Sequence, residues 1–187
     1  MVLAKLLDNL VYTIESRGFS IKDYLYPGLS RQEISELLQG IPVSFPESFY
    51  QLYQWRNGHN IQCQHFLFAE YQFLPIQDAI SEYTEISKYY NSSIHKVSIR
   101  HCFPIATFQG DSIAIYCRDE FFYGLSYPII NIGEGIAIAY ENLELFIRTM
   151  TEWYGSGIYD SDSVDDQRRW AIQHTLNPHV PKLTTSF

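Results

Sequence analysis

The chain has 187 residues with a formal net charge of −8, and 46% of its residues are hydrophobic and 16% aromatic. This length and composition predict one globular domain with a core of its own, and they exclude a disordered chain. The acidic balance argues against nucleic acid and anionic membranes as partners, because like charges repel, and it permits a basic protein partner.

The first third of the chain is expected to be helical. Apolar residues recur at helical spacing over residues 3–14, and Gly18 suits the end of that helix. Residues 30–33, Ser-Arg-Gln-Glu, have the form of a capping box and open a second helix. Residues 44–47 repeat this start signal for a third helix, which we expect Asn57-Gly58 to cap at its C-terminal end.

The middle of the chain changes from helical to strand periodicity. A strand is indicated at residues 65–69. A helix is indicated at residues 75–90, and its apolar face carries Ile76, Ala79, Ile80, Tyr83 and Tyr90. Short β-rich runs separated by turn residues follow at residues 103–107, 112–117, 127–132 and 136–140. Helices first and consecutive strands next predict an α+β fold, with a mostly antiparallel sheet flanked by helices.

Two more helices are expected towards the C-terminus, at residues 142–153 and 164–176. Between them, residues 155–163 are rich in Gly, Ser and Asp, a composition typical of a linker. We therefore expect residues 1–155 to form a single domain. Residues 156–187 are expected to contain a short linker, a C-terminal helix and a frayed tail.

Two stretches of the chain carry a recognisable set of motifs. The first begins at Leu25-Tyr26-Pro27-Gly28, continues with Phe45-Pro46-Glu47 and ends in Trp55-Arg56-Asn57-Gly58. The second runs from Phe103-Pro104-Ile105-Ala106 to Gly110-Asp111. In this order they resemble the SUKH superfamily, the Smi/Knr-type family of cell-wall regulators and immunity proteins. The positions that match the family motifs are Pro27, Gly28, Pro46, Trp55, Asn57, Gly58, Gly110 and Asp111.

The resemblance implies an α+β domain without catalytic machinery. Bacterial members of the superfamily are commonly immunity proteins that neutralise a toxin by binding it, and eukaryotic members act in signalling scaffolds. The chain departs from the pattern at His59, where the family often has a second glycine, and in the single glycine before Asp111. The motif residues also have ordinary structural explanations, because Trp55 suits a buried position and Gly110-Asp111 suits a tight turn.

Metal binding and catalysis find little support in the sequence. Cys63-x-His65 and His101-Cys102 together contain four potential zinc ligands, but neither spacing is that of a known zinc motif. With Cys117 the cysteines number three, an odd count that favours reduced thiols in the cytoplasm. No motif supplies the groups that a Cys–His nucleophile needs around it. We expect no catalytic residues, no metal and no cofactor.

Carboxylates follow one face of the helix expected at residues 75–90. No lysine or arginine lies between Arg56 and Lys88, whereas three acids there are spaced i, i+4 and i+7: Asp78, Glu82 and Glu85. On a helix they form one stripe opposite the apolar face. The stripe is either a solvated surface or a contact surface for a basic partner, which Asp119 and Glu120 can extend. Arg168-Arg169 beside Asp165-Asp166 indicates ordinary ion pairs on a helix surface.

Three hypotheses about function follow. The leading one is a non-catalytic protein-binding domain, an immunity protein that occludes a basic toxin domain without binding nucleic acid or membrane. The second is a cytosolic regulatory scaffold with several partners. The third, from a different class, is an enzyme whose site is dispersed along the sequence, and a pocket with convergent ionisable groups would favour it.

Overall fold

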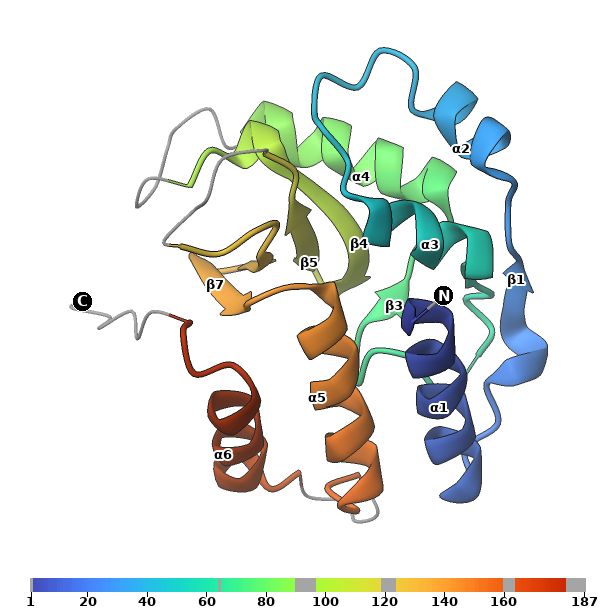
Figure 1. The fold of residues 1–187 in the computed structure, drawn as a ribbon, viewed down its shortest axis with the longest axis vertical. Coiled ribbons are helices and arrows are strands. Elements are labelled where there is room, and N and C mark those ends of the chain that lie inside the picture. The colour runs from blue at the N-terminus through green and yellow to red at the C-terminus, as the bar shows by residue number, and fades with distance from the viewer. Residues whose placement is uncertain (1, 64, 90–96, 119–123, 160–163, 181–187) are drawn as a thin grey trace.

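The computed structural model describes residues 2–63, 65–89, 97–118, 124–159 and 164–180. Helices and strands are both present in this part of the chain, so the predicted α+β class is confirmed (Figure 1). The α-helices are α1 (Val2–Ser16), α2 (Arg31–Leu37), α3 (Glu47–Trp55), α4 (Ile76–Tyr89), α5 (Leu143–Gly155) and α6 (Asp166–Leu176). None of the described helices has both the length and the apolar character that crossing a bilayer requires.

The main sheet has five strands in the order β3-β4-β5-β6-β7, and each strand is antiparallel to its neighbour. The strands are β3 (Gln72–Phe73), β4 (Cys102–Phe108), β5 (Asp111–Tyr116), β6 (Ile129–Ile132) and β7 (Ile136–Tyr140). Sequence neighbours are therefore spatial neighbours, as the consecutive β-rich runs predicted. A separate two-stranded sheet pairs β1 (Leu25–Pro27) with β2 (Arg56–His59).

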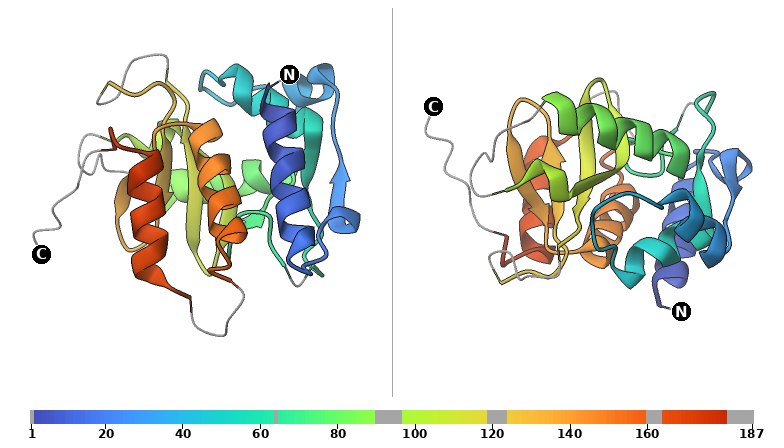
Figure 2. Two further views of the ribbon diagram at one scale, coloured as in Figure 1. Left: turned by 60° about the horizontal axis from the view of Figure 1, so that its bottom comes forward. Right: turned by 90° about the horizontal axis from the view of Figure 1, so that it is seen from above.

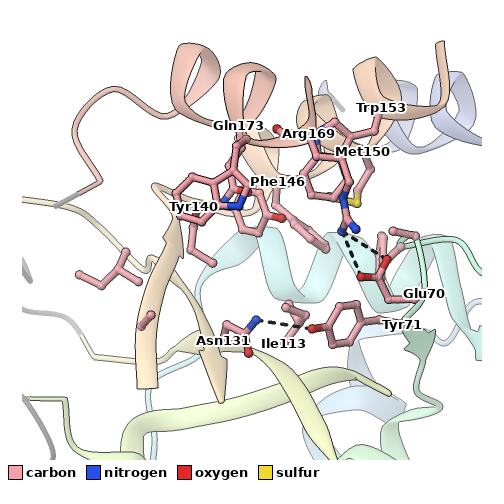
Figure 3. A pocket seen from close by; sticks show the side chains of 16 residues that line it. Glu70, Tyr71, Ile113, Asn131, Tyr140, Phe146, Met150, Trp153, Arg169 and Gln173 are labelled. Atoms are coloured by element: carbon pink, nitrogen blue, oxygen red, sulfur yellow. Dashed lines mark hydrogen bonds and ion pairs between the residues drawn. The ribbon is translucent and has the colours of Figure 1, made fainter. Parts of the chain in front are cut away.

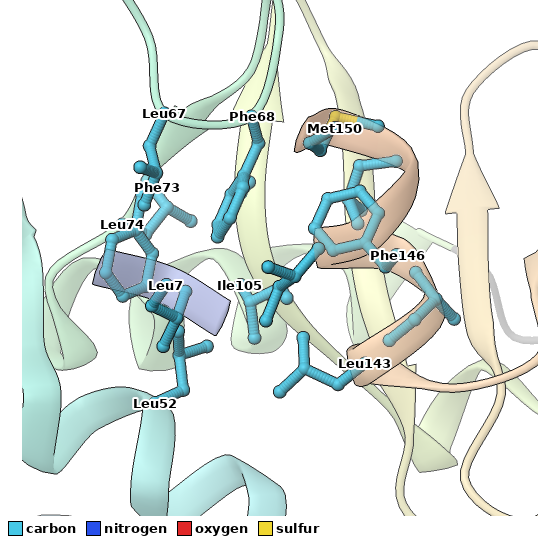
Figure 4. Packing of buried hydrophobic residues seen from close by; sticks show 14 of the residues in the cluster. Leu7, Leu52, Leu67, Phe68, Phe73, Leu74, Ile105, Leu143, Phe146 and Met150 are labelled. Carbon is cyan, nitrogen blue, oxygen red and sulfur yellow. The ribbon is translucent and has the colours of Figure 1, made fainter. Parts of the chain in front are cut away.

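The sheet lies between two layers of helices. Figure 2 (right) shows α4 on one side of it and α5 and α6 on the other. Strand alternation divides the side chains between the layers: Ile113 contributes to the large core with α5, and Ala114 to a smaller cluster beside the end of α4. The large core also takes in α1, α3 and the segment before α4, so that Leu7, Leu52, Phe68 and Phe146 pack in one cluster (Figure 4).

The turn between β4 and β5 confirms the expected tight turn and shifts it by one residue. Its two central residues are Gln109 and Gly110, with φ angles of 49° and 96°. Two consecutive positive φ angles are those of a type I′ hairpin turn, which glycine tolerates because it has no Cβ. Asp111 is already the first residue of β5 and pairs with Phe108.

Three local expectations were wrong. Pro46, and not Ser44, is the N-terminal cap of α3, and no side chain caps that end. The chain leaves α3 at Trp55 directly into extended backbone, so Asn57 and Gly58 are strand residues and not a helix cap. Residues 65–69 form only isolated bridges, because Ala69 has a φ of 58° and turns the chain back on itself.

Candidate functional site

On the apolar face of α4, Ile76, Ala79 and Tyr83 are buried as predicted and Ile80 is partly buried, while Tyr90 lies outside the described residues. The three acids of α4 are not three unpaired carboxylates. Asp78 is exposed. Glu82 accepts a 2.9 Å hydrogen bond from the buried Ser112 hydroxyl of β5, and Glu85 forms a 2.6 Å ion pair with Lys88. The expected mutual repulsion is therefore reduced, because helical periodicity shows which face a residue is on but not what lies beside it. Asp119 and Glu120, the expected extension, lie outside the described residues.

The indole of Trp55 joins two helices. Its side chain is 9% exposed, as predicted for a buried ring at the end of α3, and its Nε1–H donates a 2.8 Å hydrogen bond to Oδ1 of Asp8 on α1. The Arg56 guanidinium lies 5.3 Å from the ring centroid. These contacts agree with a structural role for this motif position.

Two motif glycines mark places where backbone segments touch. A Cβ at Gly28 would stand 1.9 Å from the carbonyl oxygen of Gln54 in α3, and a Cβ at Gly58 would stand 2.2 Å from the nitrogen of Pro75. No side chain fits at either position without moving backbone. Beside Gly58, Oδ1 of Asn57 accepts a 2.9 Å hydrogen bond from the Ile76 amide and thereby holds the first turn of α4.

The two motif prolines differ in their surroundings. Pro27 is exposed at the end of β1, and Pro46 is buried at the start of α3. Neither position brings a reactive group to the surface. Together with Gly28 and Gly58, these positions show that the first motif stretch builds the junction of β1, α3, β2 and α4.

The three thiols are free and buried. Burial raises the pKa of Cys63, Cys102 and Cys117 above the usual value for a thiol, so they stay protonated and weakly nucleophilic at neutral pH. Over the described ranges, no group of three or more His, Cys, Asp or Glu side chains is arranged to hold a metal ion.

A cavity of about 320 Å³ lies between the sheet, α5 and α6 (Figure 3). The sheet contributes the short side chains of Ala137, Ala139 and Asn131 to it, and the larger ones of Ile113, Ile138 and Tyr140. The short side chains leave space that larger residues would fill. The other walls carry aromatic rings, among them Tyr71, Phe146, Trp153 and Trp170.

Charged and polar side chains meet at one end of this cavity. Nη2 of Arg169 on α6 lies 3.0 and 3.4 Å from the two carboxylate oxygens of Glu70, and the guanidinium lies 4.5 Å from the centroid of the Trp153 ring. Below this pair, Nδ2 of Asn131 donates a 3.4 Å hydrogen bond to the Tyr71 hydroxyl (Figure 3). The cavity thus combines an aromatic wall with an ion pair, which is an arrangement suited to binding a ligand or a side chain of a partner.

The tyrosines of this region are held neutral. Burial raises the pKa of Tyr71, the neighbouring carboxylates Glu70 and Asp111 raise it further, and Asn131 and Arg169 lower it. Burial likewise raises the pKa of Tyr140 and Tyr159. A neutral phenol donates and accepts hydrogen bonds but is a poor base at neutral pH.

Sequence reasoning missed this cavity. Arg169 was expected to pair on the helix surface, but its closer partner is Glu70, 99 positions earlier in the chain, while Asp166 lies 3.7 Å away. Glu70 is one of the acids in the stretch without lysine or arginine between Arg56 and Lys88, and its spacing does not place it on the acidic stripe. No local pattern indicates an ion pair between residues this far apart in sequence.

Comparison with known proteins identifies one family. The sequence model of the SMI1 / KNR4 family (SUKH-1) matches residues 28–156, which is well over half of the chain. The matched range contains α2 to α5 and the main sheet, and it ends before α6. No curated protein matches the chain.

Proposed function

The chain belongs to the SMI1 / KNR4 family (SUKH-1), and on this premise we propose that it is a non-catalytic protein-binding domain for a basic partner. One observation carries the choice of partner: Asp78 and Glu85 are exposed on α4, Glu85 in an ion pair with Lys88, and no lysine or arginine lies from residue 57 to residue 87. The net charge of the whole chain is −8. The electrostatic field of this negative charge speeds the approach of a cationic protein and slows that of an anionic one.

The finer proposal is an immunity protein that occludes a toxin domain. The family includes immunity proteins, and occlusion requires affinity and shape but no reactive group. The raised pKa values of the thiols and tyrosines support this choice over an enzyme, since they leave those groups unreactive at neutral pH. Free buried thiols support a cytoplasmic location.

The first experiment identifies the partner. The full chain is used as bait in its native host, and bound proteins are identified by mass spectrometry. We expect a single basic protein with a toxin domain. Several cytosolic partners would instead support the regulatory scaffold, and conversion of a small-molecule substrate by the purified chain would contradict the non-catalytic proposal.

The second experiment measures association with that partner by stopped flow. We expect the double variant Asp78→Asn, Glu85→Gln to associate about three- to tenfold more slowly at low salt, with dissociation little changed. Glu82 is left intact because its removal would deprive the buried Ser112 hydroxyl of its acceptor. The matched control, Glu144→Gln with Glu152→Gln on exposed positions of α5, removes the same charge elsewhere. Equal slowing by both pairs would mean that only net charge matters and that α4 is not the contact surface.

A further inference from the structure

Arg169 occupies a place built to hold a guanidinium. Glu70 faces one edge of the group with both carboxylate oxygens, and the rings of Trp153 and Tyr159 lie 4.5 and 5.8 Å from its carbon. A carboxylate combined with aromatic faces is the set of contacts that proteins use for arginine. Glu70 and Trp153 lie inside the range that matches the family, whereas Tyr159 and Arg169 lie outside it. The carboxylate and the indole therefore belong to the domain, and the arginine is delivered by the segment that follows it.

The helix that delivers Arg169 is held by polar contacts together with the partly buried Ile172. No residue of α6 is buried, and Trp170 is 63% exposed. Besides the ion pair, the Arg169 carbonyl accepts a 3.1 Å hydrogen bond from Nε1 of Trp153, and Nε2 of Gln173 donates one of 2.9 Å to the Ala139 carbonyl. Beyond the helix, the buried Asn177 anchors its far end through the Glu141 amide and the Thr149 hydroxyl. Directional contacts of this kind can be exchanged for equivalent contacts from another chain at modest cost.

Space and charge around the place that Arg169 occupies favour a cation over an anion. The cavity of about 320 Å³ continues past the ion pair over Asn131 and the alanines of β7, which is room for a side chain entering from a partner. Glu70 and Asp111 both act on Tyr71, and Asp166 lies 3.7 Å from Arg169. Among the described residues here, the carboxylates of Glu70, Asp111 and Asp166 outnumber the guanidinium of Arg169, and an entering carboxylate would meet net repulsion.

We propose that the cavity under α6 receives an arginine side chain of the basic partner, and that Arg169 fills the same place when no partner is bound. This deepens the proposed function and rests on it. The arginine in cis is present at a high effective concentration because it is attached to the domain, so it competes with any arginine in trans. Removing Arg169 must therefore strengthen the binding of a cationic peptide, and loosening α6 must do the same to a smaller extent.

The test is a titration of the full-length protein with acetyl-Gly-Arg-Gly-amide, followed by NMR at the indole N–H of Trp153 and the side-chain amide of Asn131. Compared with the native chain, we expect Arg169→Gln to bind the peptide about tenfold more tightly. The matched control is Arg168→Gln, which removes the same charge from an exposed position one residue away and should stay within about twofold. Glu70→Gln should abolish the shifts at both reporters.

A second variant guards against a folding defect at position 169. Asp165→Ala removes the N-terminal cap of α6, whose carboxylate accepts from the Arg168 amide at 3.0 Å, and leaves every cavity residue in place. It should raise affinity for the arginine peptide about two- to fivefold, because the competitor in cis is held less firmly.

Several results would overturn the proposal. These are equal or weaker peptide binding by Arg169→Gln, an equal gain in Arg168→Gln, or tighter binding of acetyl-Gly-Glu-Gly-amide than of the arginine peptide. The titration needs no natural partner, so these results leave protein binding itself standing. Failure of the bait experiment to yield any basic protein would instead contradict the proposed function.

Discussion

Helices α1 and α6 both pack against α5, one on each side, but they are attached in different ways (Figure 2, left). Five residues of α1 are buried: Leu3, Leu7, Leu10, Val11 and Ile14. None of the residues of α6 is fully buried: Ile172 packs on the core while partly exposed, and the other contacts are the ion pair and hydrogen bonds of Arg169, Gln173 and the C-terminal cap Asn177. Both helices lie outside the range that matches the family.

The difference shows which helix is part of the core and which is attached to it. Burial of a leucine side chain stabilises the folded state by about 1.5–3 kcal/mol, and several such residues on one face add up to a large total. A hydrogen bond stabilises it by only about 0.5–1.5 kcal/mol net, because the same groups bond to water when the bond is broken. We infer that α1 cannot leave without unfolding the domain, whereas α6 can loosen locally, as the proposed arginine exchange requires.

The strongest test of the α1 side is Trp55→Ala. We expect it to lower the free energy of unfolding by about 3–5 kcal/mol, because it removes a buried ring and the acceptor Asp8 loses its donor. Urea denaturation at pH 7 measures the change. Trp55→Phe, which keeps most of the apolar contact, should cost clearly less, and an unchanged midpoint in the alanine variant would contradict the buried position.

A pair of matched truncations compares the two helices directly. Leu10→Ala in α1 should cost about 2–5 kcal/mol, because the side chain is fully buried and its removal leaves a cavity. Ile172→Ala in α6, which is only partly buried, should cost less than about 1 kcal/mol. The same urea experiment applies to both variants, and equal costs would remove the distinction between the helices.

The buried His59 at the end of β2 makes the stability of the domain sensitive to acid. The Phe73 amide donates to Nδ1 of this ring, and burial lowers the pKa of His59 to about 4 from a usual value near 6.5. As the pH falls below about 6.5, the unfolded chain takes up the proton before the folded chain does. Stability should therefore be full above pH 6.5 and decline by on the order of 3 kcal/mol as the pH falls to 4.

Chemical denaturation at pH 7, 5.5 and 4 measures this decline. The control is His59→Asn, because its Oδ1 can replace Nδ1 as acceptor and does not titrate. In the variant, the free energy of unfolding should fall less steeply between pH 7 and pH 4, because the imidazole no longer takes up a proton. An equally steep fall in the variant and the native chain would show that His59 is not the responsible group.

The smallest expected effect concerns the attachment of α6. Gln173→Ala removes the 2.9 Å hydrogen bond to the Ala139 carbonyl and should increase amide hydrogen exchange in α6 by a factor corresponding to about 0.5–1.5 kcal/mol. Exchange in α1 should not change. Gln167→Ala, at an exposed position of the same helix, is the control. Faster exchange in α1 and α6 together would mean that they open as one unit.

Local patterns in the sequence determined the helices and most of the sheet. The capping box at Ser30 and Glu33 is present with both of its hydrogen bonds, and the predicted face of α4 buries Ile76, Ala79 and Tyr83. These features depend on residues at most a few positions apart, where periodicity and capping rules apply. The strand expected at residues 65–69 failed for a related reason, because apolar composition alone does not reveal the positive φ of Ala69.

Tertiary structure decided which side chains meet across the domain. Helical spacing predicted a solvent-exposed Glu82, but this residue is only partly exposed, because the packing of α4 on the sheet brings its carboxylate to Ser112 of β5. Arg169 meets Glu70 and Trp153 because α6 lies along α5 and over the sheet, and nothing within a few residues of any of the three specifies that meeting. An ion pair between positions 99 apart is set by how whole elements pack, since neither side chain alters the local conformation of the other.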